Sequence, residues 1–587
     1  MRVFLDLMWY FKQHKRRYLV GIFMLVLVAF LNLIPPQVVG IIVDAVRHHT
    51  LTQGMLFRWL GLLVLTGLIT YVLRYFWRLL LFGSAVGLST VLRNRLYEHF
   101  SLLSPQFYHR HRIGDLMAHA TNDIQAVEAT AGEGILTLVD SVTTGSIVTL
   151  TMATTISWKL TLVALLPMPL MALATSFYGS RLHKTFKLAQ EAFSKINERV
   201  QENISGVRVV KAFGQEEVEK RDFAELSQEV VEKNVAVAKI DALFDPTISL
   251  IVGISFFLSI SVGAVFVVQH TDPLSIGQLT TFTMYLGQLI WPMLAFGWLF
   301  NIVERGRASN DRVRELLAIE PEIVDAPNAL DVPPTGAIDY RIQSFAYPDA
   351  AAPVLQNLFF TLHPGQTLGV VGKTGSGKTT LLRLLLREFD CHDGDIQIGG
   401  NSIYHYKLQQ LRQTMAYVPQ DHFLFSTTIA ENIAFGNTAA SASDVHQAAQ
   451  TASIHEDILR FPDGYKTMVG ERGVTLSGGQ KQRISIARAL LMDADVLILD
   501  NSLSAVDAKT EVQILDALRT TRSGKTTLIA SHRLSAIEHA DLILVLDGGH
   551  VIERGTHADL MARDGWYALM YQRQQLESLV EEGGVIA

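Results

Sequence analysis

Long apolar runs and short alternating segments divide this sequence of 587 residues into two parts with different patterns. A chain of this length exceeds one ordinary hydrophobic core, so at least two domains are expected. The first part, up to about residue 302, holds nearly all the apolar runs that reach the roughly 20 residues a bilayer-spanning helix needs. The runs expected to be membrane helices lie at residues 18–43, 56–82, 135–157, 160–178, 248–268 and 279–300.

The connections between these runs differ in length. The outer loops are short, whereas about 50 residues separate the second and third runs and about 70 separate the fourth and fifth. Much of the longer connection has a helical pattern, at residues 182–202 and 218–239. We therefore expect the membrane helices to continue beyond the bilayer, with residues 121–127 and 206–215 at the turns of these extensions. In the first run, Pro35-Pro36 should interrupt the helix, and neighbouring helices can bind the freed carbonyl groups.

Positive charge predicts the orientation. Five basic residues precede the first run, whereas the loop 270–275 contains no Lys or Arg. By the positive-inside rule the N-terminus is cytoplasmic, and six spans return the C-terminus to the same side. The aromatic residues beside the basic cluster predict that residues 1–17 form a short elbow helix in the membrane interface.

Composition supports a membrane protein. Only 18% of the residues are charged, against about 25% in soluble proteins, and the mean hydropathy is +0.24. The net charge of −6 and the lack of a long basic run argue against a nucleic-acid partner. The single cysteine, Cys391, excludes an intramolecular disulfide.

The pattern changes after residue 317. Residues 318–334 contain four prolines and no long apolar run, which predicts a linker. Beyond it, short β-branched runs alternate with helical segments, which is typical of a largely parallel sheet covered by helices. The expected fold is therefore a multi-domain one, with an all-α six-helix transmembrane domain at residues 18–317 and an α/β P-loop domain at residues 335–575, followed by a tail at residues 576–587.

A glycine-rich segment between a predicted strand and a predicted helix is the strongest chemical motif. It reads Gly372, Lys373, Thr374, Gly375, Ser376, Gly377, Lys378 and Thr379, and Thr380 follows in the helix. Glycines let the backbone wrap around phosphate oxygens, and the helix N-terminus supplies positive potential. Lys378 should reach the outer phosphates of a nucleotide and Thr379 should bind Mg²⁺. Downstream, a buried strand ends in Asp500, where a second Mg²⁺ residue belongs in a P-loop enzyme.

Between these motifs lies a third, with a predicted helix directly after it. It reads Leu476, Ser477, Gly478, Gly479 and Gln480. With this motif the sequence resembles the ATP-binding cassette exporters, over nearly the whole chain. The resemblance implies that the signature caps the γ-phosphate of a nucleotide held by an opposite subunit. Such a role is physically sensible, because Ser477 and the two glycine amides open a helix and can bind an anion.

The same resemblance implies roles for further residues. Tyr347 matches the aromatic residue that stacks on adenine, Gln420 the glutamine that senses Mg²⁺ and the attacking water, and His532 the histidine that contacts the γ-phosphate. Residues 504–507, which end in Asp507, match the loop that links the two nucleotide sites, and residues 467–471 resemble the segment that contacts the coupling helices. The implied cofactors are ATP and Mg²⁺, with Thr379, Gln420 and Asp500 as the metal ligands.

Asn501 departs from the family, which usually has a glutamate there to polarise the attacking water. An amide cannot accept a proton at neutral pH, and general-base help is typically worth roughly 10²–10⁴-fold in rate. The site built on Lys378 should therefore bind ATP well and hydrolyse it poorly, while the intact signature would complete a partner's site. Three interpretations stay open: an asymmetric heterodimer, a regulatory half without turnover of its own, and a homodimeric lipid flippase in which Asn501 is an engineered replacement.

The resemblance implies ATP-driven export by alternating access, across the bacterial inner membrane, with a second half-transporter as partner. Its implied cargo is a hydrophobic or amphipathic compound, drugs included. Inside the apolar runs, Arg74, Arg78 and Asp140 are either structural or contacts for a charged cargo. Aromatic residues in the last run either line a cargo cavity or pack the helices: Phe282, Tyr285, Trp291, Phe296, Trp298 and Phe300.

Overall fold

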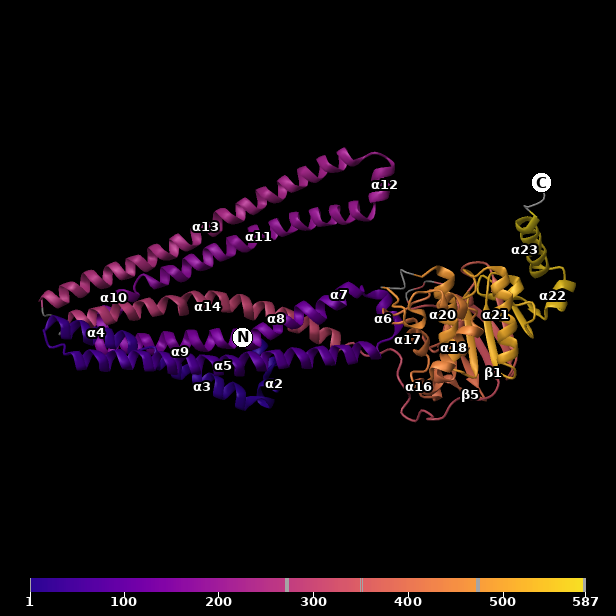
Figure 1. Ribbon diagram of the computed structural model, residues 1–587, viewed down its shortest axis with the longest axis horizontal. Helices are drawn as coiled ribbons and strands as arrows, with labels where there is room; N and C mark the ends of the chain where they lie inside the picture. Colours follow the sequence, from indigo (N-terminus) through magenta and orange to yellow (C-terminus); the bar gives the residue numbers. More distant parts are fainter. Residues whose placement is uncertain (1, 270–273, 349, 351, 471–475, 584–587) are drawn as a thin grey trace. The chain divides into compact units, whose positions relative to one another are not determined.

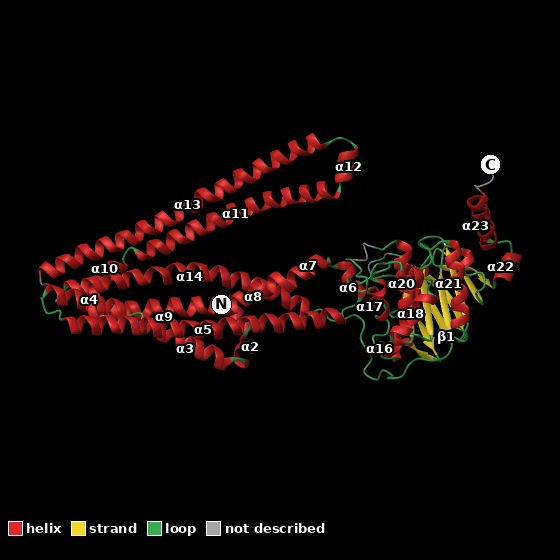
Figure 2. Ribbon diagram, viewed as in Figure 1, coloured by secondary structure: helices red, strands yellow, loops and turns green. Residues whose placement is uncertain are grey.

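The computed structural model describes residues 2–269, 274–348, 350, 352–470 and 476–583. Contacts divide the chain into two compact units, which are described separately. The first unit comprises Met1–Leu102 and Tyr108–Glu320, and the second comprises Leu103–Phe107 and Pro321–Ala587. Within the described residues, the first unit is helical throughout and the second contains all the strands (Figures 1 and 2).

The first unit contains the predicted number of membrane spans. Among the described residues, 6 helical segments are long and apolar enough to cross a membrane, which confirms the prediction. The shortest of the last five has 42 residues, or about 63 Å of helix, whereas the bilayer core is about 30 Å thick. These helices therefore extend beyond the bilayer, as predicted. The segments are Lys15–Arg47, Gln53–Leu102, Ile113–Ile156, Trp158–Ser205, Glu216–Gln269 and Ile276–Leu317.

The proline pair interrupts the first span as predicted. Helix α3 (Lys15–Leu31) ends and α4 (Ile34–Arg47) begins around the two residues Asn32 and Leu33. Two carbonyl groups at this break accept hydrogen bonds from α14 (Ile276–Leu317): Gln288 Nε2 donates to the Asn32 oxygen at 2.9 Å and the Tyr285 hydroxyl to the Leu33 oxygen at 2.8 Å. A neighbouring helix thus binds the carbonyl groups that the break exposes.

The first long connection turns at a different place from the one predicted. Helix α5 (Gln53–Leu102) ends before Pro105, and α6 (Pro105–Arg110) forms the turn. Residues 121–127 instead lie inside the helical segment Ile113–Ile156, so the prediction of a turn there is wrong. The physical reason is Pro105, because a residue that precedes proline avoids the α conformation and ends the helix.

The second long connection turns where the sequence predicts. Helices α11 (Met168–Ser205) and α13 (Glu216–Gln269) run side by side, and the short α12 (Val207–Ala212) joins them at the tip of the pair (Figure 1). Arg199 of α11 forms an ion pair with Glu219 of α13 at 2.9 Å. Apolar side chains remain exposed around the tip.

Two sheets form the frame of the second unit. The six-stranded sheet has the order β10-β9-β3-β8-β7-β6 and is parallel except for the β10–β9 pair, which confirms the largely parallel sheet. A second sheet, which is antiparallel and has the order β2-β1-β4-β5, was not expected from the sequence. The strands are β1 (Ile338–Phe345), β2 (Leu355–Leu362), β3 (Thr367–Gly372), β4 (Asp393–Ile398), β5 (Asn401–Ser402), β6 (Met415–Val418), β7 (Val496–Asp500), β8 (Thr526–Ala530), β9 (Leu542–Asp547) and β10 (His550–Gly555).

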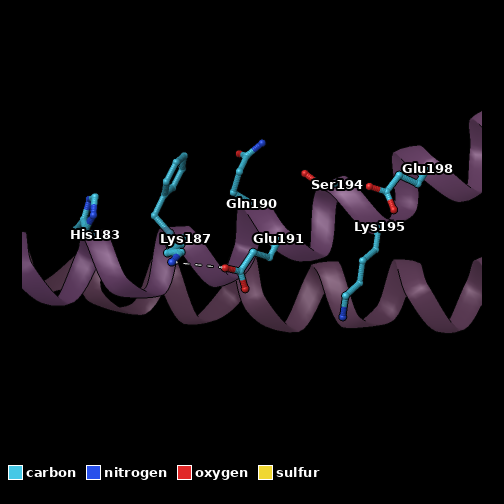
Figure 3. A pocket seen from close by; sticks show the side chains of 8 residues that line it. His183, Lys187, Gln190, Glu191, Ser194, Lys195 and Glu198 are labelled. Carbon is cyan, nitrogen blue, oxygen red and sulfur yellow. Dashed lines mark ion pairs between the residues drawn. The ribbon is translucent and has the colours of Figure 1, made fainter. Parts of the chain in front are cut away.

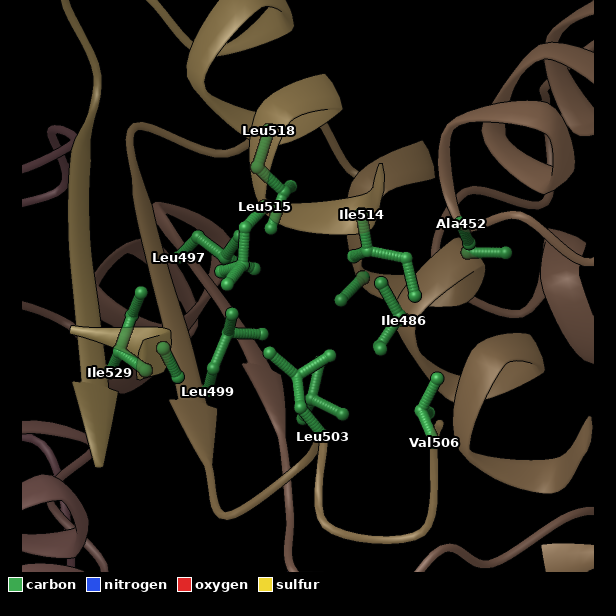
Figure 4. Packing of buried hydrophobic residues seen from close by; sticks show 14 of the residues in the cluster. Ala452, Ile486, Leu497, Leu499, Leu503, Val506, Ile514, Leu515, Leu518 and Ile529 are labelled. Carbon is green, nitrogen blue, oxygen red and sulfur yellow. The ribbon is translucent and has the colours of Figure 1, made fainter. Parts of the chain in front are cut away.

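Helices cover the central strands. Every residue of β7 and β8 is buried, as expected of parallel strands packed on both faces. Figure 4 shows Leu497 and Leu499 of β7 beside Leu515 and Leu518 of α21 (Ala508–Thr521). This packing fixes the carboxyl ends of the central strands, where the chemical motifs lie.

The proline-rich segment before β1 is bound to the second unit. Leu330 forms a β-bridge with Tyr406, and the Arg387 Nη2 group donates to the Val324 carbonyl oxygen at 3.0 Å. These contacts hold the segment in place over much of its length.

Candidate functional site

A cavity of about 290 Å³ lies at the carboxyl ends of the six-stranded sheet. Its wall combines the glycine-rich segment after β3, a residue after β6, two residues at the end of β7 and one after β8. The structure thus brings together motifs that are far apart in the sequence. The predicted site residues that line the cavity are Tyr347, Thr374, Gly375, Ser376, Gly377, Lys378, Thr379, Thr380, Gln420, Asp500, Asn501 and His532.

Two glycines of the loop have no room for a side chain. A Cβ atom on Gly372 would lie 2.1 Å from the Leu546 carbonyl oxygen, and one on Gly377 would lie 2.6 Å from Leu355 Cδ2. Gly377 also has φ +103°, which disfavours other residues. It directly precedes α15 (Lys378–Leu385), so the N-terminus of this helix opens into the cavity. The loop can therefore bind phosphate with backbone N–H groups.

Lys378 is a buried cation of the loop. Its Nζ donates to the Gly372 and Lys373 carbonyl oxygens at 2.8 and 2.9 Å. Burial lowers the pKa of Lys378, and the nearby Asp500 carboxylate opposes that shift. A phosphate would give this ammonium group charge-assisted hydrogen bonds, which are stronger than those to neutral carbonyls. Lys373, by contrast, points outward and lies 3.6 Å from Asp547.

Oxygen-bearing side chains gather around Asp500. The Thr379 hydroxyl donates to Asp500 Oδ1 at 3.0 Å and the Tyr417 hydroxyl donates to Oδ2 at 3.2 Å. Burial raises the pKa of Asp500, and these hydrogen bonds and nearby cations oppose the shift. One carboxylate beside hydroxyl and amide oxygens, including that of Gln420, suits Mg²⁺, which takes few protein ligands and binds substrate phosphates. The residues present therefore fit a nucleotide-bound magnesium ion.

Tyr347 contacts the first turn of α15, one residue beyond Thr379. Its hydroxyl shares a hydrogen bond with Thr380 Oγ1 at 2.8 Å, and its ring lies edge-on against Phe389 with the centroids 4.9 Å apart. These contacts fix the ring beside the phosphate loop. Stacking of the ring on adenine stays a prediction.

Asn501 and His532 face the same cavity from adjacent strands. The Asn501 N–H donates to the Ala530 oxygen at 2.8 Å, and its φ of +50° lies in the left-handed region, which Asn tolerates better than most residues. Burial, and next the charge of Lys378, lower the pKa of His532. Its imidazole is therefore neutral near pH 7 and can donate only one ring hydrogen bond.

The signature motif lies away from this cavity. Ser477 begins α20 (Gly478–Leu491) and forms a capping box: its Oγ accepts from the Gln480 N–H at 3.3 Å, and Gln480 Oε1 accepts from the Ser477 N–H at 3.0 Å. Asp507 likewise caps α21 by accepting from the Thr510 N–H at 3.0 Å. The predicted site residues outside the cavity wall are Gly372, Lys373, Ser477, Gly478, Gly479, Gln480 and Asp507.

Three neighbours of the site were not identified from the sequence. Val354 lines the cavity, and Tyr417 binds Asp500. Arg383 acts electrostatically on both Asp500 and Tyr417. Tyr417 could have been found, because it lies in the strand directly before Gln420. The predicted segment 467–471 is only partly described; in it, the Thr467 carbonyl oxygen accepts from the Ile429 N–H at 3.0 Å.

Of the charged and aromatic candidates in the first unit, Asp140, Phe282 and Tyr285 have structural surroundings. Asp140 Oδ1 accepts from Thr144 Oγ1 at 3.1 Å. Phe282 and Tyr285 are fully buried, which favours helix packing over a cavity lining for these two. Trp291 remains 58% exposed. The side chain of Phe296 lies outside the described residues.

A second hollow, of about 460 Å³, lies along α11 (Figure 3). Its wall has mixed charges, with Lys187 Nζ 3.9 Å from Glu191 Oε1. No arrangement there points to a particular ligand among the described residues. The lining residues are His183, Phe186, Lys187, Gln190, Glu191, Ser194, Lys195 and Glu198.

Both units match models of known families. The ABC transporter transmembrane region matches residues 18–293 and the ABC transporter model matches residues 355–504. The multidrug resistance-like ATP-binding protein MdlA of Escherichia coli K12 is 49% identical over 582 residues, which cover 99% of this chain and 98% of that protein. The probable multidrug resistance ABC transporter ATP-binding/permease protein YheI of Bacillus subtilis 168 is 48% identical over 577 residues, with 98% of each chain covered.

A solved structure has the same architecture. The bacterial Atm1-family ABC exporter with ATP bound superposes with a TM-score of 0.79 at 28% identity, covering 95% of this chain and 98% of that one. The likeness therefore extends over both units.

Proposed function

Since this chain belongs to the ATP-binding cassette exporters, as a P-loop ATPase coupled to transport, we propose that it is one half of a heterodimeric exporter. In this proposal its own cavity binds ATP firmly and hydrolyses it slowly. A partner with a glutamate at the position of Asn501 supplies the competent site, and Ser477, Gly478, Gly479 and Gln480 of this chain complete it.

Asn501 is the observation that carries the proposal. It faces the cavity beside Asp500 and His532, where a water molecule would approach the terminal phosphate. Its amide can orient that water but cannot take the proton. In this scheme His532 donates a ring N–H to the terminal phosphate and is assigned no role as the base. The cavity of this chain would therefore bind ATP but hydrolyse it slowly.

The other cavity residues have roles in binding. Lys378 binds the outer phosphates, the loop amides bind the remaining oxygens, and Tyr347 stacks on the adenine. Thr379, Asp500 and Gln420 would hold a magnesium ion, which when bound neutralises charge on the phosphate oxygens. In-line attack by water then depends on positioning more than on covalent chemistry.

The proposed cargo is a hydrophobic or amphipathic compound, moved across the bacterial inner membrane. The relatives from E. coli and B. subtilis both have names of the multidrug-resistance type, which supports this class. Trp291 and Trp298 of α14, 58% and 47% exposed, are available to contact an apolar molecule. Both chain termini are proposed to lie in the cytoplasm.

The proposed partner is a second half-transporter. Near the tip of the α11–α13 pair, Val209 and Phe213 are 61% and 73% exposed. Apolar residues this exposed on a helix tip suit burial against another chain. The signature residues also need a partner chain in this proposal, because they lie outside the chain's own cavity.

The test is ATPase activity in lipid nanodiscs, for the chain alone and for the chain co-purified with its genomic neighbour. Each is assayed unchanged and with Asn501→Glu, Asn501→Asp and Asn501→Gln. The Asp variant adds a carboxylate that tolerates the left-handed backbone, and the Gln variant controls for side-chain length without adding a base.

For the heterodimer we expect the unchanged complex to hydrolyse ATP and the acidic variants to change its rate by less than about 2-fold, because the partner site dominates. The chain alone should stay slow. If the chain alone becomes a fast ATPase with Asn501→Glu or Asn501→Asp, but not with Asn501→Gln, it is a homodimer and the heterodimer proposal is wrong.

A further inference from the structure

The helix near the C-terminus holds the backbone around His532. Gln574 of α23 (Trp566–Gly583) donates from Nε2 to the His532 carbonyl oxygen at 2.8 Å, and its Oε1 accepts from the Leu534 N–H at 2.9 Å. One planar amide thus pairs with two backbone groups that are two residues apart, much as a neighbouring strand would. The bond to the His532 carbonyl is exposed, whereas Leu534 is buried, so the Leu534 N–H has the greater need of a protein partner.

The base of α23 is well anchored. Glu553 accepts from the Trp566 N–H at 2.6 Å, which places a carboxylate at the start of the helix, where it is favourable. Tyr567 is fully buried, and the Tyr571 hydroxyl donates to Glu538 at 2.8 Å. Gln574 therefore extends from a fixed helix and not from a loose tail.

The same segment is held from its other side by Arg533. The Arg533 Nη1 group donates to the Val506 carbonyl oxygen at 3.0 Å and pairs with Glu511, whose side chain is only 3% exposed. Val506 belongs to the loop 504–507, directly before α21. The residue beside His532 is thus tied to that loop, while Gln574 binds the backbone on both sides of Arg533.

We propose that Gln574 is a positioning residue for the ATPase site, which fixes the backbone of His532 so that the cavity discriminates ATP from ADP. The inference rests on the proposed contact between His532 and the terminal phosphate. Gln574 does not line the cavity, so it acts through His532. It also lies outside residues 355–504, which the family model matches.

The expected consequence is a selective loss of affinity. Without the amide, the His532 carbonyl and the Leu534 N–H lose their partner, and the segment samples positions that do not reach the terminal phosphate. A ligand that needs the correct position then binds more weakly in proportion to the population lost. ADP lacks that phosphate, so its affinity should not change.

The experiment measures the affinities of ADP and of the non-hydrolysable analogue adenylyl imidodiphosphate, with Mg²⁺, for the full-length chain in nanodiscs. Gln574→Glu keeps the acceptor for Leu534 but loses the donor to His532. Gln574→Met removes both hydrogen bonds at similar length. Gln572→Glu, at an exposed position two residues earlier on the same helix, is the charge-matched control.

We expect Gln574→Glu to weaken binding of the analogue about 5-fold, the usual worth of one hydrogen bond, and Gln574→Met to weaken it at least as much. Both variants should leave the affinity for ADP within about 2-fold. Gln572→Glu should leave both affinities unchanged. If the affinities for ADP and for the analogue fall together, or if neither falls, Gln574 has no positioning role. The ADP affinity also reports whether each variant is folded.

A double-mutant cycle with His532→Ala separates this inference from the proposed function. We expect His532→Ala alone to lower the affinity for the analogue but not for ADP. Adding Gln574→Glu to the His532→Ala variant should lower it no further. If His532→Ala has no selective effect, the proposed contact with the phosphate is wrong, and the inference falls with it. If His532→Ala is selective but the effect of Gln574→Glu persists in full beside it, the inference alone is wrong.

Discussion

Two helices in the second unit, α15 and α20, begin at motifs that contain Ser and Gly, but the two helix starts have different surroundings. Helix α15 begins after Gly377 and α20 begins after Ser477, and both follow motifs that suit an anion. The start of α15 faces a cavity with a buried lysine and a buried carboxylate from the same chain. The start of α20 is closed by a capping box between Ser477 and Gln480. Among the described residues, none from elsewhere in the chain forms a cavity around it with the phosphate loop.

The difference shows what one chain can do alone. The phosphate loop has its cation, its carboxylate and its shaped backbone in place, so it can bind nucleotide without help. Among the described residues, the signature offers the Ser477 hydroxyl and the amides that begin α20, without the buried lysine and carboxylate that face the phosphate loop. In the proposed dimer, a nucleotide between the two motifs would be held by two chains.

The largest expected effect comes from Lys378→Met. It removes the buried ammonium group and should weaken ATP binding to the isolated chain by about 10–100-fold, the range for a charge-assisted hydrogen bond. Lys373→Met is the matched control, because Lys373 points outward to Asp547, and it should change affinity by less than about 2-fold. Titration with a fluorescent ATP analogue measures both. Equal losses in the two variants would contradict the role given to Lys378.

Gly478→Asp tests the start of α20. A Cβ atom there lies 3.8 Å from its nearest neighbour, Ala505, and a carboxylate favours a helix N-terminus, so the fold should tolerate the change. The new charge repels a partner's phosphates, so turnover of the co-purified complex should fall about 10-fold or more while ATP binding to the isolated chain is unchanged. Gly478→Asn adds a side chain of the same shape without the charge, so it should reduce turnover of the complex less than Gly478→Asp does. Weaker binding in the isolated chain would show that the signature belongs to its own cavity.

Asp500→Asn tests the buried carboxylate that lines the cavity at the start of α15. Burial raises the pKa of Asp500, so the folded chain binds this proton more tightly than the unfolded chain does. The stabilising effect is present below the unfolded pKa of about 3.9 and is lost as the pH rises through the folded value. Asp500→Asn should therefore raise the unfolding temperature of the nucleotide-free chain, more at pH 8 than at pH 4, and abolish the Mg²⁺ dependence of ATP binding. Thermal unfolding across that pH range measures the first effect; an unchanged or lower unfolding temperature at pH 8 would contradict it.

The smallest effect is expected from Ser477→Ala, which removes one cap. The free energy of unfolding should fall by about 1 kcal/mol, with no change in ATP binding to the isolated chain. Ser441→Ala removes the same kind of capping box from α18 (Ala442–Thr451) and should cost as much stability. Only Ser477→Ala should also slow the co-purified complex. If both variants slow it equally, the serine acts through stability alone.

The sequence by itself determined the number of membrane spans, the break at Pro35-Pro36 and the largely parallel sheet. These features follow from apolar length, from the missing N–H of proline and from β-branched runs, all of which act locally. The phosphate loop was also readable, because its glycines, its lysine and its flanking strand and helix are adjacent in the chain. The turn predicted at residues 121–127 was wrong, because Pro105 ends the preceding helix earlier, a local signal that the sequence prediction did not use.

The family resemblance implied that Asp500, Gln420 and His532 share a site, but only the tertiary structure gives the physical reason. They line one cavity because parallel strands place their carboxyl ends at the same edge of the sheet. The contact of Gln574 with the backbone around His532 has no local signal, since a glutamine on a polar helix face looks like any solvated residue. Likewise, the sequence left open whether Tyr285 lines a cavity or packs between helices. The structure shows that it is buried and bonded to the Leu33 carbonyl, which favours packing. Such contacts depend on chain reversals between the residues, and reversals are set by packing over the whole unit and not by the pattern of any one segment.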